Sequence, residues 1–154
     1  MVEVMIVVAI LAVLLGIAAP AYTEMVASQR VRDTASDLHT SLMRARSEAI
    51  SRSTPVTIKA VGGNLANGWH IADPSGTYNP DPANPTVFIE QHGPVKSSTI
   101  AGATDVTFTN VGRLSGGAIA IKISVTGTAV TRCVTADLAG RAKIRTIAAS
   151  DACT

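Results

Sequence analysis

Residues 1–22 read MVEVMIVVAILAVLLGIAAPAY, a run that is almost purely apolar from Val4 to Ala19 and has one carboxylate ahead of it, at Glu3. As a helix, the apolar run would measure about 24 Å and residues 1–21 about 31 Å, against a bilayer hydrocarbon core of about 30 Å. The stretch therefore predicts a segment that can just span a membrane. A cleaved signal peptide, which needs a basic region before the apolar run, and a buried core helix are the alternatives.

A helical pattern continues beyond Pro20. No glycine or proline occurs between Ala21 and about Ser53. Apolar residues recur there at spacings of three and four, at Val31, Ala35, Leu38, Leu42, Ala45 and Ala49. This pattern predicts an amphipathic helix that continues the apolar one. We expect a kink at Pro20, which lacks a backbone N–H. Residues 1–21 then form the membrane-spanning half, and residues 22–154 form a globular domain that includes the amphipathic half.

After Pro55 the hydrophobic period changes from 3.6 to 2, which indicates strands. Glycine-containing segments separate most of the predicted strands, and a proline-rich stretch at 73–85 predicts an irregular loop. The predicted strands are 56–60, 68–71, 86–91, 105–109, 118–125, 130–135 and 141–147. The chain is therefore predicted to be an α+β protein, whose long N-terminal helix packs on a small antiparallel β-sheet or sandwich.

Composition limits the function classes only weakly. The chain has 154 residues, 47% of them apolar and 3% aromatic, which suits one domain plus an appendage with a core of aliphatic side chains. The formal net charge of +2 neither favours nor excludes nucleic-acid or membrane partners. Any such partner has to be argued from local patches of charge.

Cys133 and Cys153 are the two cysteines of the chain. In an exported domain an even number of cysteines favours a disulfide, which here would tie the C-terminal tail to the last strands. Closing a loop of about twenty residues contributes on the order of 3 kcal/mol. A reduced, buried pair is the alternative. Two cysteines without a third or fourth ligand at suitable spacing do not predict a metal site.

Histidines and glycines give no pattern typical of catalysis. His39, His70 and His92 belong to no recognisable Ser/His/Asp, Cys/His or metal-ligand arrangement, and the Glu90-x-His92 pair is generic. The glycine pairs of the chain lack the following helix and lysine of a phosphate-binding loop. We therefore expect neither enzymatic activity nor a cofactor.

Residues 1–11 together with 19–22 resemble the N-terminal signature of mature type IV pilins and type II secretion pseudopilins. In those proteins an acid follows the prepilin peptidase cut by a few residues, and a proline and a tyrosine come just after the apolar run. Family members usually begin with a methylated Phe and one further residue ahead of the position of Met1. The resemblance therefore predicts that two residues are missing before Met1, or that the start was assigned late.

Further motifs are similar to those of the GspH, FimT and FimU group of minor pilins and H-type pseudopilins. The resemblance covers most of the chain, and residues 73–93 are not matched. The motifs are the helical pattern from Arg30 to Arg52, Gly68-Trp69, Phe108 to Arg113, and Arg132-Cys133-Val134. The resemblance implies the pilin fold, a long N-terminal helix packed on a small β domain.

The resemblance also implies a structural function. Such subunits are held in the bacterial inner membrane with the globular domain in the periplasm, are processed by prepilin peptidase, and are then stacked with other subunits into a type IV pilus or a type II secretion pseudopilus. Glu3 matches the acid that is taken to neutralise the N-terminal ammonium of a neighbouring subunit. The alternative is that Glu3 lies at headgroup level in the favourable field of the helix N-terminus.

Residues 140–145, GRAKIR, offer a second candidate site. A strand would place Arg141, Lys143 and Arg145 on one face, where they could contact the phosphates of DNA. Some FimT members are DNA receptors for natural transformation and carry a Gly-Arg-x-Arg motif, from which this chain departs at Lys143. An ordinary solvated strand face is the alternative to DNA binding. An unrelated single-pass membrane protein is the third reading of the whole chain.

Overall fold

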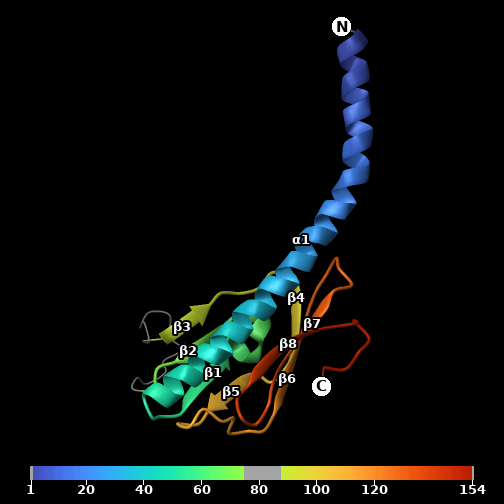
Figure 1. Cartoon of the computed structure of the whole chain (residues 1–154). Helices are drawn as coiled ribbons and strands as arrows, with labels where there is room; N and C mark the ends of the chain where they lie inside the picture. The colour runs from blue at the N-terminus through green and yellow to red at the C-terminus, as the bar shows by residue number, and fades with distance from the viewer. Residues whose placement is uncertain (1, 75–87, 154) are drawn as a thin grey trace.

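Helix α1 (Val2–Ser51) is the longest element of the chain. The computed structural model describes residues 2–74 and 88–153, without the side chains of residues 14, 15 and 17–21. The N-terminal part of α1 stands clear of the rest of the molecule, and the helix curves before its C-terminal part meets the β-strands (Figure 1). The backbone stays helical through residue 20, and a kink at Pro20 itself stays a prediction.

The apolar stripe predicted for the second half of α1 is the face that packs on the domain. Its six residues are each no more than 1% exposed: Val31, Ala35, Leu38, Leu42, Ala45 and Ala49. Three of them are alanines, so the helix backbone can approach the strands closely. The stripe begins one turn earlier than predicted, because Ala27 is also buried.

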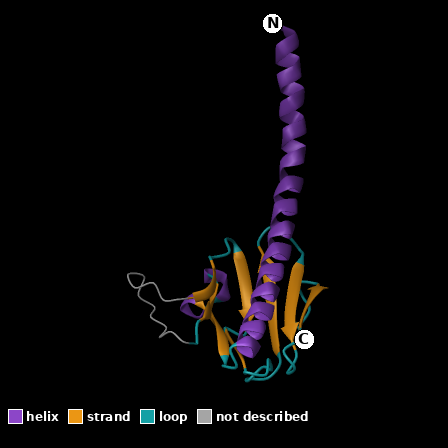
Figure 2. Cartoon of the chain, turned by 60° about the vertical axis from the view of Figure 1, so that its left-hand side comes forward, coloured by secondary structure: helices purple, strands orange, loops and turns teal. Residues whose placement is uncertain are grey.

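The strands form two four-stranded antiparallel sheets in the described part of the chain, in the orders β3-β2-β1-β5 and β4-β6-β7-β8. Two short 3-10 turns, at Val61–Gly63 and Leu65–Asn67, lie between β1 and β2. The strands are β1 (Val56–Ala60), β2 (Trp69–Ala72), β3 (Phe88–His92), β4 (Ser98–Gly102), β5 (Asp105–Phe108), β6 (Ile119–Val125), β7 (Thr131–Ala136) and β8 (Ala142–Ile147). Figure 2 shows α1 lying across these strands.

Two details differ from the sequence prediction, and one prediction falls outside the described residues. Strand β4 was not predicted. Residues 73–85, predicted as a loop, lie almost entirely outside the described part of the chain. Strand β8 begins at Ala142, so Arg141 precedes the strand instead of belonging to it.

One hydrophobic core joins the helix to both sheets. On the first sheet Ile58 pairs with Ile71, and on the second Ile121 pairs with Val134, so these side chains share the face that α1 covers. All four are at most 1% exposed. Alternation along β1 and β6 puts polar or smaller side chains on the other face, as expected of sheets with one buried face.

Candidate functional site

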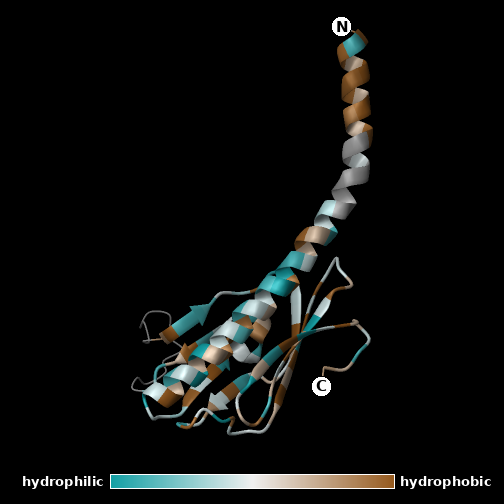
Figure 3. Ribbon diagram, in the orientation of Figure 1, coloured by the Kyte–Doolittle hydropathy of each residue, from teal (hydrophilic) through white to brown (hydrophobic). Residues whose placement is uncertain are grey.

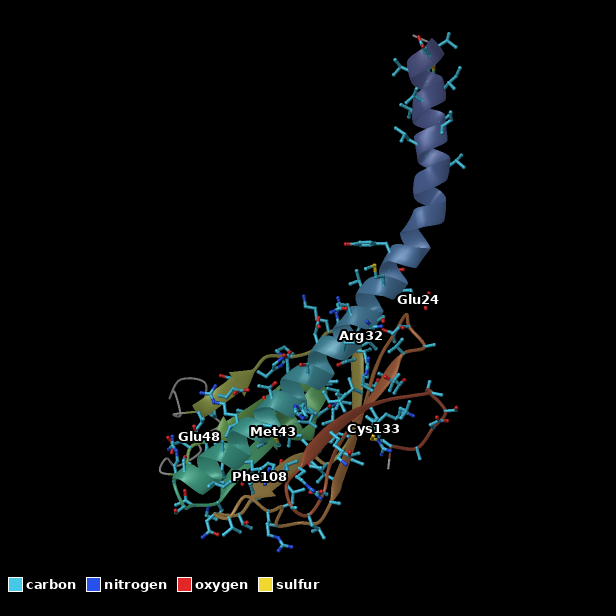
Figure 4. All side chains as sticks on the ribbon, in the orientation of Figure 1. Glu24, Arg32, Met43, Glu48, Phe108 and Cys133 are labelled. Atoms are coloured by element: carbon cyan, nitrogen blue, oxygen red, sulfur yellow. A yellow bond between two sulfur atoms is a disulfide. The ribbon has the colours of Figure 1, made fainter. Side chains whose placement is uncertain are left out.

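The N-terminal part of α1 is apolar and has no intramolecular partner in the described structure. Its large side chains are between 51% and 74% exposed: Val2, Val4, Met5, Ile6, Val7, Val8, Ile10, Leu11 and Val13. They project on all sides of the helix in Figure 4, and the corresponding ribbon is hydrophobic in Figure 3. A continuous apolar surface of this extent marks a site of contact with another molecule or with lipid.

Glu3 lies in the first turn of this exposed helix. A carboxylate is favourable there because the free N–H groups of the first turn carry a partial positive charge. Within the described residues Glu3 makes no ion pair. Any cation that pairs with Glu3 therefore has to come from outside the described part of the chain.

A search of the described residues finds no helix with a stretch long and apolar enough to cross a membrane.

The predicted disulfide between Cys133 and Cys153 is present in the structure, with a Cα–Cα distance of 5.5 Å. Cys133 is fully buried on β7, and Figure 4 labels it near the C-terminal segment. The neighbouring strand also holds the tail, because Lys122 Nζ donates to the carbonyl oxygens of Ala149 at 2.6 Å and Asp151 at 2.9 Å. Residues 149–153 are thus attached to the outer face of the second sheet at two places.

Arg141, Lys143 and Arg145 line a single depression of about 560 Å³, which we call the basic groove. Lys143 and Arg145 come from alternate positions of β8, and Cys153 forms part of the wall. Arg141 reaches the groove from the loop before β8. The structure therefore brings the three predicted cations together, although Arg141 is not a strand residue.

Asp137 partly neutralises the basic groove. Its Oδ1 accepts a hydrogen bond from the backbone N–H of Arg141 at 3.0 Å, and its Oδ2 accepts one from the Arg141 Nε at 2.8 Å. The backbone hydrogen bond, and then the guanidinium, lower the pKa of the Asp137 carboxyl. Lys143 makes no ion pair within the described residues. The groove keeps a positive character and suits an anionic ligand.

A polar network that the sequence did not predict connects α1 to the first sheet. Trp69 Nε1 donates to Ser41 Oγ at 3.0 Å, Ser41 Oγ donates to Glu90 Oε1 at 2.5 Å, and Arg44 pairs with Glu90 at 3.2 Å. The ring of His92 stacks on that of Trp69 with centroids 4.0 Å apart. Periodicity could not reveal these contacts, because the partners are far apart in sequence.

The histidines form no catalytic arrangement in the described structure. His70 is buried on β2, and burial, followed by the charge of Lys59, lowers its pKa. His92 Nε2 lies 3.2 Å from Asp37 Oδ2 at the surface of the helix. No group of three or more His, Cys, Asp or Glu side chains could hold a metal ion among the residues that the structure describes.

The fold is similar to that of a solved minor pilin and a solved minor pseudopilin. The type IV minor pilin FimU of Pseudomonas aeruginosa is 22% identical with a TM-score of 0.62, and the match covers 76% of this chain and 89% of that one. The minor pseudopilin EpsH of the Vibrio cholerae type 2 secretion system is 13% identical with a TM-score of 0.55, over 79% of this chain and 99% of that one. A search of curated proteins finds no match.

The long helix on two small antiparallel sheets is thus the fold of these minor pilin and pseudopilin structures. A family model described as type II transport protein GspH matches residues 34–140, which is more than half of the chain. The chain belongs to the GspH family. The membership excludes the reading as an unrelated single-pass membrane protein.

Proposed function

We propose that the chain is a structural subunit that assembles through its N-terminal helix into a type IV pilus or a type II secretion pseudopilus. The observation that carries the proposal is the contrast within α1. The side chains of residues 2–13 are exposed and almost all apolar, whereas residues 27–49 bury a stripe against the strands. One helix therefore anchors the domain and offers a free apolar rod to neighbouring subunits.

Before assembly, residues 1–21 hold the subunit in the inner membrane and the globular domain of residues 22–154 lies in the periplasm. The length of residues 1–21 supports this proposal, since a helix of about 31 Å matches a hydrocarbon core of about 30 Å. We further propose that prepilin peptidase processes the precursor and that the new N-terminus is methylated. Mass spectrometry of the N-terminal peptide from recovered filaments tests this proposal.

Glu3 is proposed to pair with the N-terminal ammonium of a neighbouring subunit. Replacing Glu3 with Leu or Ala is expected to reduce incorporation into filaments on the order of tenfold, equivalent to about 1.4 kcal/mol. The reason is that the ammonium would be left without a counter-charge among apolar helices. Quantitative immunoblotting of sheared filaments against total cell protein measures the effect.

The matched control is Glu24→Ala, which removes another exposed acid from the same helix. It is expected to leave incorporation within about twofold of the parent chain, because surface charges contribute little. Normal incorporation of Glu3→Leu would contradict the pairing. Failure of the parent chain to enter any filament would contradict the proposed function itself.

A second candidate function, DNA binding during natural transformation, is favoured by the basic groove. Replacing Arg141, Lys143 and Arg145 with Ala is expected to weaken duplex DNA binding by the full chain in detergent at least tenfold. The magnitude of the slope of log affinity against log salt concentration should fall by about 2. The reason is that a protein with fewer phosphate contacts displaces fewer counterions from the DNA when it binds. Fluorescence anisotropy with a labelled duplex, from low to physiological salt, measures both quantities.

The control triple variant replaces Arg32, Lys96 and Arg113, three exposed cations outside the groove, with Ala. It changes the net charge by the same amount, so an equal loss of affinity would indicate a diffuse charge effect instead of a site. If the parent chain does not bind DNA at low salt, this second function is wrong.

A further inference from the structure

A lysine beside the basic groove is covered by the C-terminal tail, residues 149–153. Lys122 of β6 lies on the outer face of the second sheet, where it pairs across the strands with Cys133 of β7, and Cys133 pairs with Arg145 of β8. The basic groove is lined by the next row of the same face: Ala120, Thr135 and Lys143. Successive residues on one face of a strand are about 6.8 Å apart, so Lys122 lies one row away from the groove.

The tail holds the ammonium group of Lys122. Its Nζ donates to the carbonyl oxygen of Ala149 at 2.6 Å and to that of Asp151 at 2.9 Å. The disulfide keeps the tail over the same row of side chains, and Figure 4 labels Cys133 near this segment. Lys122 is half-buried as a result, whereas the three cations of the basic groove are exposed.

Release of the tail would change two charges near the groove. Lys122 would lose its carbonyl partners and become available to an anion, and the carboxylate of Asp151 would move away with the tail. The other charged groups of the outer face, including the ion pair of Asp137 with Arg141, belong to segments that stay in place. Charges within about 8 Å of each other still interact at physiological salt, so both changes favour an anion in the groove.

We propose that Lys122 is a latent fourth cation of the basic groove, and that the disulfide-held tail keeps it out of contact with a bound anion. The inference rests on the second candidate function, DNA binding by the groove, and adds a regulated phosphate contact to that site. A dithiol releases the tail: the Sγ–Sγ bond between Cys133 and Cys153 takes up two electrons and two protons and becomes two thiols, while the dithiol becomes a disulfide. The hydrogen bonds from Lys122 to the tail then remain, and water competes with them because Ala149 and Asp151 are exposed.

Binding of a labelled DNA duplex by the full chain in detergent, with and without a dithiol, tests the proposal. Fluorescence anisotropy should show that reduction tightens binding about three- to tenfold at low salt, because one more phosphate is contacted. The slope of log affinity against log salt concentration should grow in magnitude by about 0.9, the value for one phosphate contact. The double variant Cys133→Ala with Cys153→Ala should bind as tightly as the reduced parent and should not respond to the dithiol.

Lys122→Ala separates the latent cation from a general effect of releasing the tail. In the oxidised chain this variant should bind within about twofold of the parent, because Lys122 does not reach the ligand there. After reduction it should gain less than about twofold in affinity, since the fourth cation is missing. The matched control Lys96→Ala removes an exposed lysine outside the groove and should keep the full gain on reduction.

Acetylation of lysine side chains, measured by mass spectrometry, provides a second measurement on the same samples. In the oxidised chain a bound duplex should protect Lys143 and leave the slow reaction of Lys122 unchanged. In the reduced chain the duplex should protect both lysines. Near-UV circular dichroism of the reduced chain checks that it is folded under the conditions of the binding experiment.

Several results would overturn the inference and leave DNA binding by the groove standing. These are an affinity of the folded chain that reduction leaves unchanged or lowers, a gain that survives Lys122→Ala, and a reduced chain that unfolds, because no folded state would then offer the fourth cation. If the parent binds no DNA in either state, the second function fails and inorganic polyphosphate is the probe. A gain in polyphosphate affinity on reduction that depends on Lys122 would then support the latent cation without DNA, and the lack of such a gain would overturn it.

Discussion

Replacing Trp69 with alanine is expected to lower the free energy of unfolding by about 3–5 kcal/mol, the usual range for a buried tryptophan. Trp69 is fully buried under α1, its ring stacks on His92 with centroids 4.0 Å apart, and its Nε1 donates to Ser41 Oγ at 3.0 Å. The substitution removes the ring that fills the space between helix and sheet. The midpoint of thermal unfolding should fall by roughly 10 °C or more, measured by near-UV circular dichroism of the full chain in detergent.

Trp69→Phe is the matched control, because it keeps an aromatic ring but loses the N–H donor. We expect a loss of about 1–2 kcal/mol from the missing hydrogen bond and the smaller ring. Ser41 still donates to Glu90 in this variant, so the rest of the network stays connected. Equal effects of the two substitutions would show that the hydrogen bond, and not ring packing, carries the stability at this position.

Removing the disulfide with the double change Cys133→Ala and Cys153→Ala is expected to cost about 3 kcal/mol. The two cysteines are 20 residues apart in sequence, and a cross-link of that length restricts the unfolded chain by about this amount. The hydrogen bonds from Lys122 to the tail restrain only the folded state and cannot replace this effect. Thermal unfolding of parent and variant under the same oxidising conditions measures the difference.

Reduction provides the control for the disulfide. A thiol reductant should destabilise the parent chain by the same amount and leave the double variant unchanged. A double variant that unfolds at the temperature of the oxidised parent would contradict the prediction. A reductant effect on the double variant would point to a cause other than this bond.

The helix could be predicted from the sequence because its pattern is local. Val31, Leu38 and Ala45 recur at the spacing that places them on one face of a helix. An apolar face of this kind is expected to be buried against the rest of the domain, and the three residues are buried. Strands β6 and β7 were predicted for the same reason, since β6 alternates buried and half-buried residues. The cysteine count determined the pairing of the predicted disulfide, because only one pairing is possible within a single chain, although a reduced pair remained the alternative.

The remaining features depend on contacts between distant residues. Strand β4, with the sequence STIAG, shows no alternation of apolar and polar residues, and none of its residues is completely buried. Its pairing with β6 is therefore what reveals it. Arg141 is held in the basic groove by Asp137, which a strand pattern cannot indicate.

The continuity of α1 has a mechanical consequence. A force that pulls on the N-terminal end of the subunit passes along a single helix into the buried stripe from Ala27 to Ala49. The stripe runs parallel to such a force, so its contacts are sheared together and cannot peel apart one at a time. The disulfide closes the C-terminal end of the second sheet against unravelling. Under the proposed function, this arrangement would keep the subunit folded under axial tension.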